Sequence, residues 1–142
     1  MPELIICRGV PGCGKSTYAQ AWVKAGRDRV RINRDDLRHM LFDKYWGLDE
    51  DFVTVVADKI FEAALQEGKS IVIDNTNIKP GDAKPFVDKA RWMDYDVKIK
   101  QFDVPLEVAL ERNAARSRQV PPEVIERMFA KLEEIGPLDD YL

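Results

Sequence analysis

The sequence predicts an α/β fold with a short, four-stranded parallel sheet and helices on both of its faces. Four short apolar segments, residues 4–7, 30–32, 70–73 and 97–102, have the length and composition of strands. Stretches with the apolar spacing of helices separate them, and this alternation is typical of parallel sheets covered on both sides. A polar or glycine-containing motif follows each predicted strand. The functional site is therefore expected at the carboxyl ends of the strands.

The predicted strands differ in how completely they should be buried. Residues 4–7 (Leu-Ile-Ile-Cys) and 70–73 (Ser-Ile-Val-Ile) are nearly continuous apolar runs, which favours strands covered on both faces. Residues 97–102 alternate between apolar and polar positions, so this strand should be less buried.

Capping residues, glycines and prolines define the helix boundaries. Asn33 predicts an N-cap, Gly68 a helix stop, and Pro80 and Pro105 the starts of two further helices. The tail from residue 136 to 142 is expected to be irregular. Six helices are predicted, over residues 15–25, 34–41, 51–66, 80–93, 105–115 and 123–135.

Length and composition predict one soluble domain. The chain has 142 residues, 45% of them hydrophobic and 33% charged, which is enough to bury a core. No run reaches the roughly 18 apolar residues of a membrane span, and the N-terminus lacks the order of a signal peptide. We expect a cytoplasmic protein without a membrane partner, while the oligomeric state is left open.

The thiols and most aromatic residues are expected to serve packing. Cys7 and Cys13 should both be reduced, because two cysteines at these positions make a disulfide scaffold implausible. Core packing is favoured over base stacking for a set of aromatic residues that fall mostly at helical spacing. These are Trp22, Trp46, Trp92, Phe52, Phe61, Phe86 and Phe129.

Positive charge is concentrated in one third of an otherwise acidic chain. The net charge is −3 and the pI about 5.3, so the chain as a whole should repel nucleic acid. Residues 24–38, however, contain six basic residues and only three acidic ones. This cluster favours an anionic partner near the first third of the chain, and a solvated charged face is the alternative.

A phosphate-binding loop directly follows the first predicted strand. Its pattern is Gly9-x-x-x-x-Gly14-Lys15-Ser16, placed between a strand and a helix. Glycines let the backbone turn its N–H groups inward, and the helix N-terminus favours negative charge. This predicts a P-loop NTPase fold in which Lys15 reaches the nucleotide phosphates and Ser16 contacts Mg²⁺.

Cys13 lies within this loop. Its position beside a helix N-terminus and Lys15 favours sensitivity to oxidation, whereas the alternative is a small residue that fills space.

A second motif follows the second predicted strand, which is expected to lie next to the phosphate loop. Asp35 and Arg38 are three residues apart and therefore share one helix face. The carboxylate can accept a proton, and the arginine can hold an anionic group of the same acceptor. The alternative is that acids after the Asn33 cap only complement the helix dipole.

Asp74-Asn75-Thr76-Asn77 follows the third predicted strand. Asp74 is a candidate for holding Mg²⁺ through water, and capping of the following turn is an equal alternative. Further along, Arg112, Arg116 and Arg118 lie in a basic, small-residue segment that fits a mobile lid. Arginines that offset a helix dipole are the alternative there.

Taken together, these motifs resemble the polynucleotide 5′-kinases, the phage-type enzyme and the kinase domain of polynucleotide kinase-phosphatases. The resemblance covers most of the chain and follows one order of motifs. They are Gly9-Val10-Pro11-Gly12-Cys13-Gly14-Lys15-Ser16-Thr17, Ile32-Asn33-Arg34-Asp35-Asp36-Leu37-Arg38, Asp74-Asn75-Thr76-Asn77, Phe102-Asp103-Val104-Pro105, and Arg112-Asn113 with Arg116.

The resemblance implies transfer of the γ-phosphate of ATP or another nucleoside triphosphate to the 5′-hydroxyl of DNA or RNA. It implies that Asp35 is the general base, that Arg38 grips the phosphate on the 3′ side of the acceptor nucleoside, and that Arg116 closes over the donor phosphates. Thr76 and Asn77 are implied acceptor contacts. The implied donor and metal positions are Gly9, Gly12, Cys13, Gly14, Lys15, Ser16, Thr17, Asp74, Arg112 and Arg116.

One departure from the family pattern and two rival functions remain. No Asp-x-Asp phosphatase motif accompanies the kinase motifs, so the chain is a stand-alone kinase or a domain excised from a longer protein. One rival is a small-molecule kinase of the same fold, acting on a nucleoside or sugar acid. The other is a module whose nucleotide site switches its affinity for nucleic acid without phosphorylating it.

Overall fold

A computed structural model describes residues 1–47 and 49–142, and its centre is a parallel sheet. The sheet contains four strands in the order β2-β3-β1-β4. Every neighbouring pair is parallel, with Leu4 opposite Ile71 and Val97, and Val30 opposite Ile71. The predicted α/β class and strand number are confirmed. The strands are β1 (Glu3–Arg8), β2 (Arg29–Ile32), β3 (Ser70–Asp74) and β4 (Asp96–Gln101).

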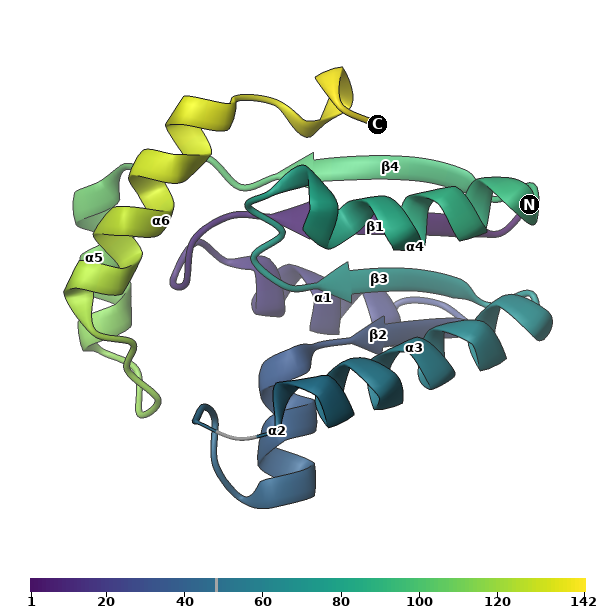
Figure 1. Cartoon of the computed structure of the whole chain (residues 1–142), viewed down its shortest axis with the longest axis horizontal. Coiled ribbons are helices and arrows are strands. Elements are labelled where there is room, and N and C mark those ends of the chain that lie inside the picture. The colour runs from purple at the N-terminus through teal and green to yellow at the C-terminus, as the bar shows by residue number, and fades with distance from the viewer. Residues whose placement is uncertain (48) are drawn as a thin grey trace.

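The six helices lie close to their predicted ranges. They are α1 (Lys15–Lys24), α2 (Arg34–Phe42), α3 (Glu50–Gln66), α4 (Pro80–Trp92), α5 (Leu106–Ala114) and α6 (Pro122–Ile135). Helices α3 and α4 cover one face of the sheet and α1 the other, while α5 and α6 lie beyond the carboxyl ends of the strands (Figure 1). Helix α2 begins at the same edge, where Asn33 accepts a hydrogen bond from the Asp36 N–H at 2.8 Å as the predicted N-cap.

Strand alternation divides the core between the two faces. Leu4 and Ile6 of β1 pack with the larger cluster under α3 and α4, whereas Ile5 and Cys7 pack with Ala19 of α1. Burial raises the pKa of the Cys7 thiol to about 12, and the nearby Asp74 carboxylate adds to the shift. Cys7 is therefore a core residue that stays protonated. The other thiol, Cys13, is also buried and free.

Three expectations from the sequence were wrong. Trp92 is 87% exposed, Trp46 is 58% exposed and Phe52 is 46% exposed, so helical spacing alone did not place these side chains in the core. The tail is not wholly irregular either, because residues Leu138–Asp140 form a 3-10 helix whose Leu138 is buried. The third error concerns strand order, since β3 lies between β1 and β2 and α2 does not start beside the strand of the phosphate loop.

The buried Arg8 fixes the tail to the sheet. At the end of β1, its guanidinium donates hydrogen bonds to the carbonyl oxygens of Ile78 and Gly136, both at 2.6 Å. Burial lowers the pKa of Arg8. This residue joins the turn after β3 to the tail directly behind the phosphate loop.

Within the described residues, no helix is long and apolar enough to cross a membrane.

Candidate active site

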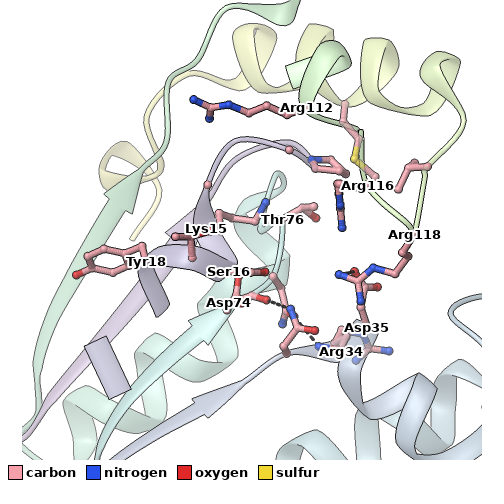
Figure 2. A pocket seen from close by; sticks show the side chains of 18 of the residues that line it. Lys15, Ser16, Tyr18, Arg34, Asp35, Asp74, Thr76, Arg112, Arg116 and Arg118 are labelled. Carbon is pink, nitrogen blue, oxygen red and sulfur yellow. Dashed lines mark hydrogen bonds and ion pairs between the residues drawn. The ribbon is translucent and has the colours of Figure 1, made fainter. Parts of the chain in front are cut away.

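A cavity of about 880 Å³ opens at the carboxyl ends of the strands. The phosphate loop, the start of α2, the end of β3 and the segment joining α5 to α6 all contribute to its wall (Figure 2). The structure thus brings most of the predicted positions into one space. Those that line it are Gly12, Gly14, Lys15, Ser16, Thr17, Asp35, Arg38, Asp74, Thr76, Arg112, Arg116 and Arg118.

Glycine is required in the phosphate loop at two positions. Gly12 has φ +85° and Gly14 has φ +104°, both in the left-handed region that side chains disfavour. A Cβ at Gly12 would also lie 2.7 Å from the Ala109 carbonyl oxygen of α5. The loop can therefore turn its N–H groups toward the cavity only with glycine at these sites.

Lys15 holds the loop together from within the cavity. Its ammonium group donates to the carbonyl oxygens of Gly9 at 2.8 Å and Val10 at 3.0 Å, and the residue is only 8% exposed. These two bonds point the ammonium along the loop, where phosphate oxygens can replace the carbonyls as partners.

Gly9 and Cys13 do not line the cavity. A Cβ at Gly9 would lie 2.6 Å from the Cys13 Sγ, so these two residues pack against each other behind the loop. The structure favours the space-filling role for Cys13, which is 3% exposed.

Asp74 forms the deep end of the cavity. Arg31 donates to its Oδ2 from Nε at 2.8 Å, and the Arg31 Nη2 lies 2.7 Å from the same oxygen. Burial raises the pKa of Asp74, and the positive charges of Arg31 and Lys15 oppose that rise. The other oxygen, Oδ1, is buried and has no hydrogen-bond partner within the described part of the chain.

This orphaned oxygen fits the ligand shell of a magnesium ion. The Ser16 side chain lies beside the Asp74 carboxylate in Figure 2, and both line the cavity. Mg²⁺ prefers a few oxygen ligands completed by water and substrate phosphates. Residues 1–47 and 49–142 contain no cluster of three or more His, Cys, Asp or Glu residues able to hold a metal. Phosphate oxygens of a bound nucleotide could supply further ligands.

Asp35 and Arg38 contact each other at the opposite end of the cavity. The Arg38 Nη1 donates to the Asp35 Oδ1 at 2.6 Å, and the carboxylate remains 44% exposed toward the cavity. Arg38 is not free, however. Its Nε and Nη2 donate to the two carboxylate oxygens of Glu50 at 2.7 and 2.5 Å.

Glu50 is the main site residue that the sequence analysis missed. It is the first residue of α3, and hydrogen bonding from Arg38 lowers its pKa. Arg34 adds a weaker contact at 3.4 Å. Because two hydrogen bonds to the Glu50 carboxylate fix the Arg38 guanidinium, Arg38 reaches Asp35 in one orientation.

Asn75 and Asn77 illustrate opposite outcomes at the turn after β3. Asn75, which carried no prediction, lines the cavity and accepts a hydrogen bond from the Arg34 N–H at 2.9 Å. Asn77, an implied acceptor contact, is 2% exposed and donates to the Cys7 carbonyl oxygen at 2.7 Å. The structure therefore places Asn77 inside the fold, where it secures the turn, while Thr76 faces the cavity.

The three predicted lid arginines have different surroundings. Arg116 lies in the segment between α5 and α6 and extends into the cavity (Figure 2). Burial, and then the charge of Arg118, lower the pKa of Arg116. Arg112 extends over Gly14, whereas Arg118 lies 3.6 Å from Asp36 and 4.0 Å from Asp35. Arg118 thus links the segment between α5 and α6 to α2.

The basic cluster of residues 24–38 is split across the molecule. Lys24 and Arg27 lie at the amino end of β2, on the edge away from the cavity, and only Arg34 and Arg38 of the six line it. Strand β2 runs through the middle of the cluster, so residues close in sequence reach opposite edges of the sheet.

The match to a known family agrees with this geometry. The family model for the AAA domain known as AAA_33 matches residues 4–135. The chain belongs to the AAA_33 family. The family match and the geometry of the phosphate loop agree on a domain of the P-loop kinase fold.

Two curated relatives and one solved structure are similar over nearly the whole domain. A protein of Autographa californica nuclear polyhedrosis virus, with the provisional name bifunctional polynucleotide kinase/RNA ligase, is 30% identical over 99% of this chain and 22% of its own length. The L-seryl-tRNA(Sec) kinase of Methanococcus maripaludis is 28% identical over 94% of this chain and 53% of its own length. The chain therefore spans about a fifth of the viral relative and about half of the tRNA kinase.

The solved structure is a chain of the Pnkp1/Rnl/Hen1 RNA repair complex. It superposes with a TM-score of 0.76 at 26% identity, covering 96% of this chain and 47% of that chain. The predicted resemblance to polynucleotide kinases is confirmed at the level of the family.

Proposed function

We propose that this AAA_33 domain is a polynucleotide 5′-hydroxyl kinase, which transfers the γ-phosphate of a nucleoside triphosphate to the 5′ end of DNA or RNA in nucleic-acid repair. One observation carries the proposal. A single cavity holds Lys15 and Ser16 of the phosphate loop at one end and the Asp35–Arg38 pair at the other. The polynucleotide kinase name of the viral relative and the RNA repair complex support it.

The donor end of the cavity holds the triphosphate. The N–H groups of the loop and of the first turn of α1 bind phosphate oxygens, and Lys15 turns its ammonium from the Gly9 and Val10 carbonyls to the β- and γ-phosphates. Ser16 and, through water, Asp74 would hold Mg²⁺, which neutralises charge on the β- and γ-phosphates when bound. Arg116 supplies a positive charge to the transferred group from the lid side.

The acceptor end activates the hydroxyl. Asp35 accepts the proton of the 5′-hydroxyl while the hydroxyl oxygen bonds to the γ-phosphorus. At the same time the bond from that phosphorus to the β–γ bridging oxygen breaks, and the nucleoside diphosphate leaves. Arg38 uses N–H groups not occupied by Glu50 and Asp35 to hold the phosphate on the 3′ side of the acceptor nucleoside.

The charge lining the cavity supports a substrate with more than one phosphate group. Five arginines contribute to its wall, and Asp35 and Asp74 are the only carboxylates among the residues that line it. The five are Arg34, Arg38, Arg112, Arg116 and Arg118. With a nucleoside triphosphate at the donor end, the remaining N–H groups of the α2 arginines can meet a second anion, such as an acceptor phosphate.

A second candidate is a kinase for another hydroxyl carried by RNA, and the similarity to the L-seryl-tRNA(Sec) kinase favours it. Both candidates use Lys15 and Asp35 in the same way. They differ in the acceptor: the 5′-hydroxyl kinase labels a short 5′-hydroxyl oligonucleotide, whereas the second candidate requires the charged tRNA.

Arg38→Ala and Asp35→Asn test the proposal together. Asp35→Asn should lower kcat by about 10²- to 10⁴-fold with little change in acceptor KM. Arg38→Ala should raise the KM for a nucleoside 3′-monophosphate and for an oligonucleotide alike, because both present the same phosphate. A near-normal kcat for Asp35→Asn, measured with a 5′-hydroxyl oligonucleotide, would remove Asp35 as the base.

A further inference from the structure

Three aromatic rings lie together where α2 runs into the loop before α3. This aromatic cluster consists of His39, Tyr45 and Trp46. The rings of His39 and Tyr45 are stacked at 4.7 Å with an interplanar angle of 10°, while the Trp46 ring is tilted by 41° to that of Tyr45, with the two centroids 6.5 Å apart. Trp46 is 58% exposed although it is a large apolar side chain. Core packing therefore does not account for the stack.

Arg118 connects the aromatic cluster to the cavity. Its guanidinium carbon lies 4.6 Å from the centre of the Tyr45 ring, while its Nη2 lies 4.0 Å from the Asp35 Oδ2. The same side chain lines the cavity. The tip of the segment joining α5 to α6 approaches the loop after α2 in Figure 1, in agreement with this contact. One guanidinium group thus separates the acceptor end of the cavity from the Tyr45 ring.

This arrangement has the components of a single-strand nucleic-acid site. Nucleobases stack on exposed aromatic rings in a manner that tolerates any sequence, and arginine provides both cation–π contact and charge for the neighbouring phosphate. A free phosphate carries no flat group that could stack on these rings.

We propose that the aromatic cluster is a stacking subsite for a nucleobase at the 5′ end of the acceptor strand, with Trp46 as the exposed platform. The subsite rests on the proposed function, because it assumes that the acceptor hydroxyl lies at Asp35. The substrate is then a strand that carries bases, and its first or second base lies on the rings of the aromatic cluster.

Acceptors with one missing base test the subsite. The kcat/KM for a 5′-hydroxyl oligonucleotide is compared with that of oligonucleotides carrying an abasic residue at the first, second or fifth position. With the wild-type protein, kcat/KM should fall about tenfold when the stacked base is absent. An abasic residue at the fifth position should leave kcat/KM unchanged. Trp46→Ala should lower kcat/KM for the complete acceptor by a similar factor and should have no further effect on the acceptor that lacks the stacked base.

Trp92→Ala is the matched control. Trp92 is the last residue of α4, 87% exposed and at the edge of the sheet away from the cavity. Its replacement should leave all four acceptors unchanged.

The outcomes that overturn the subsite differ from those that overturn the kinase proposal. Equal kcat/KM for all acceptors, or an equal loss from Trp46→Ala on complete and abasic acceptors, refutes stacking while transfer itself proceeds. If no oligonucleotide is phosphorylated, the proposed function fails, and tryptophan emission during titration with a 5′-phosphorylated oligonucleotide decides the subsite. Quenching in the wild-type protein that is lost in Trp46→Ala supports it, and unchanged emission refutes it.

Discussion

Replacing Arg31 with methionine should destabilise the fold far more than an ordinary surface substitution. Arg31 is the cation that directly contacts the Asp74 carboxylate, at 2.7 and 2.8 Å, and Asp74 is 0% exposed. Removing one partner of a buried ion pair typically costs about 3–5 kcal/mol, because the remaining charge has to stay buried or be neutralised. Near 60 °C the unfolding entropy of 142 residues is about 0.3 kcal/mol/K, so the melting temperature should fall by about 10–17 °C.

A double-mutant cycle shows whether the pair is the cause. Arg31→Met, Asp74→Leu and the double variant are compared by urea unfolding at pH 7. The double variant should be at least about 2 kcal/mol more stable than the sum of the single losses predicts, because an apolar pair leaves no buried charge. A coupling energy within about 0.5 kcal/mol of zero would refute the reasoning.

The loss of stability in Arg31→Met should also depend on pH. Because burial already raises the folded-state pKa of Asp74, its contribution to stability is fully present below the unfolded pKa and is lost as pH rises through the folded value. Without Arg31 the pKa should rise further. Arg31→Met should therefore lose stability relative to the wild type as pH increases, by at most about 1.4 kcal/mol per pH unit. A stability difference between the two proteins that stays constant with pH would contradict an effect of Arg31 on the pKa of Asp74.

Three further predictions concern the loop, the lid and the acceptor end. Gly12→Ala should abolish nucleotide binding in isothermal titration, because its Cβ meets the α5 backbone, whereas Gly81→Ala, with open space around it, should leave binding intact. Arg116→Ala should lower kcat at least tenfold more than Arg112→Ala in steady-state assays; equal effects would remove the distinction between them. Glu50→Gln should raise acceptor KM by about fivefold with kcat within twofold, because half-exposed charged hydrogen bonds contribute about 1 kcal/mol, and a purely kcat effect would contradict its positioning role.

The elements predictable from the sequence are those fixed by local chemistry. The apolar run of β3, the Asn33 cap and the Gly-Lys-Ser sequence of the phosphate loop each depend on neighbouring residues, and each lies where it was predicted. The parallel topology then brings their carboxyl ends to one edge. Most of the cavity wall follows from these two facts.

Features that depend on packing between distant segments were not predictable. Glu50 reaches Arg38 only because α3 packs beside α2, and no local pattern distinguishes it from other acids at a helix start. Asn77 has the composition of a polar contact, yet the turn requires its amide to satisfy a buried carbonyl. Trp46 shares the helical spacing of core residues, but the backbone leaves the helix before reaching it.

Transfer of labelled γ-phosphate to a defined 5′ end tests the central claim most directly. The protein is incubated with Mg²⁺, γ-labelled ATP and a short single-stranded oligonucleotide that carries a 5′-hydroxyl, in parallel with the same oligonucleotide already phosphorylated at its 5′ end. The account predicts label on the hydroxyl-ended strand alone, and no label with Lys15→Ala. Label on neither strand, although ATP binds to the wild-type protein, would contradict a 5′-hydroxyl kinase.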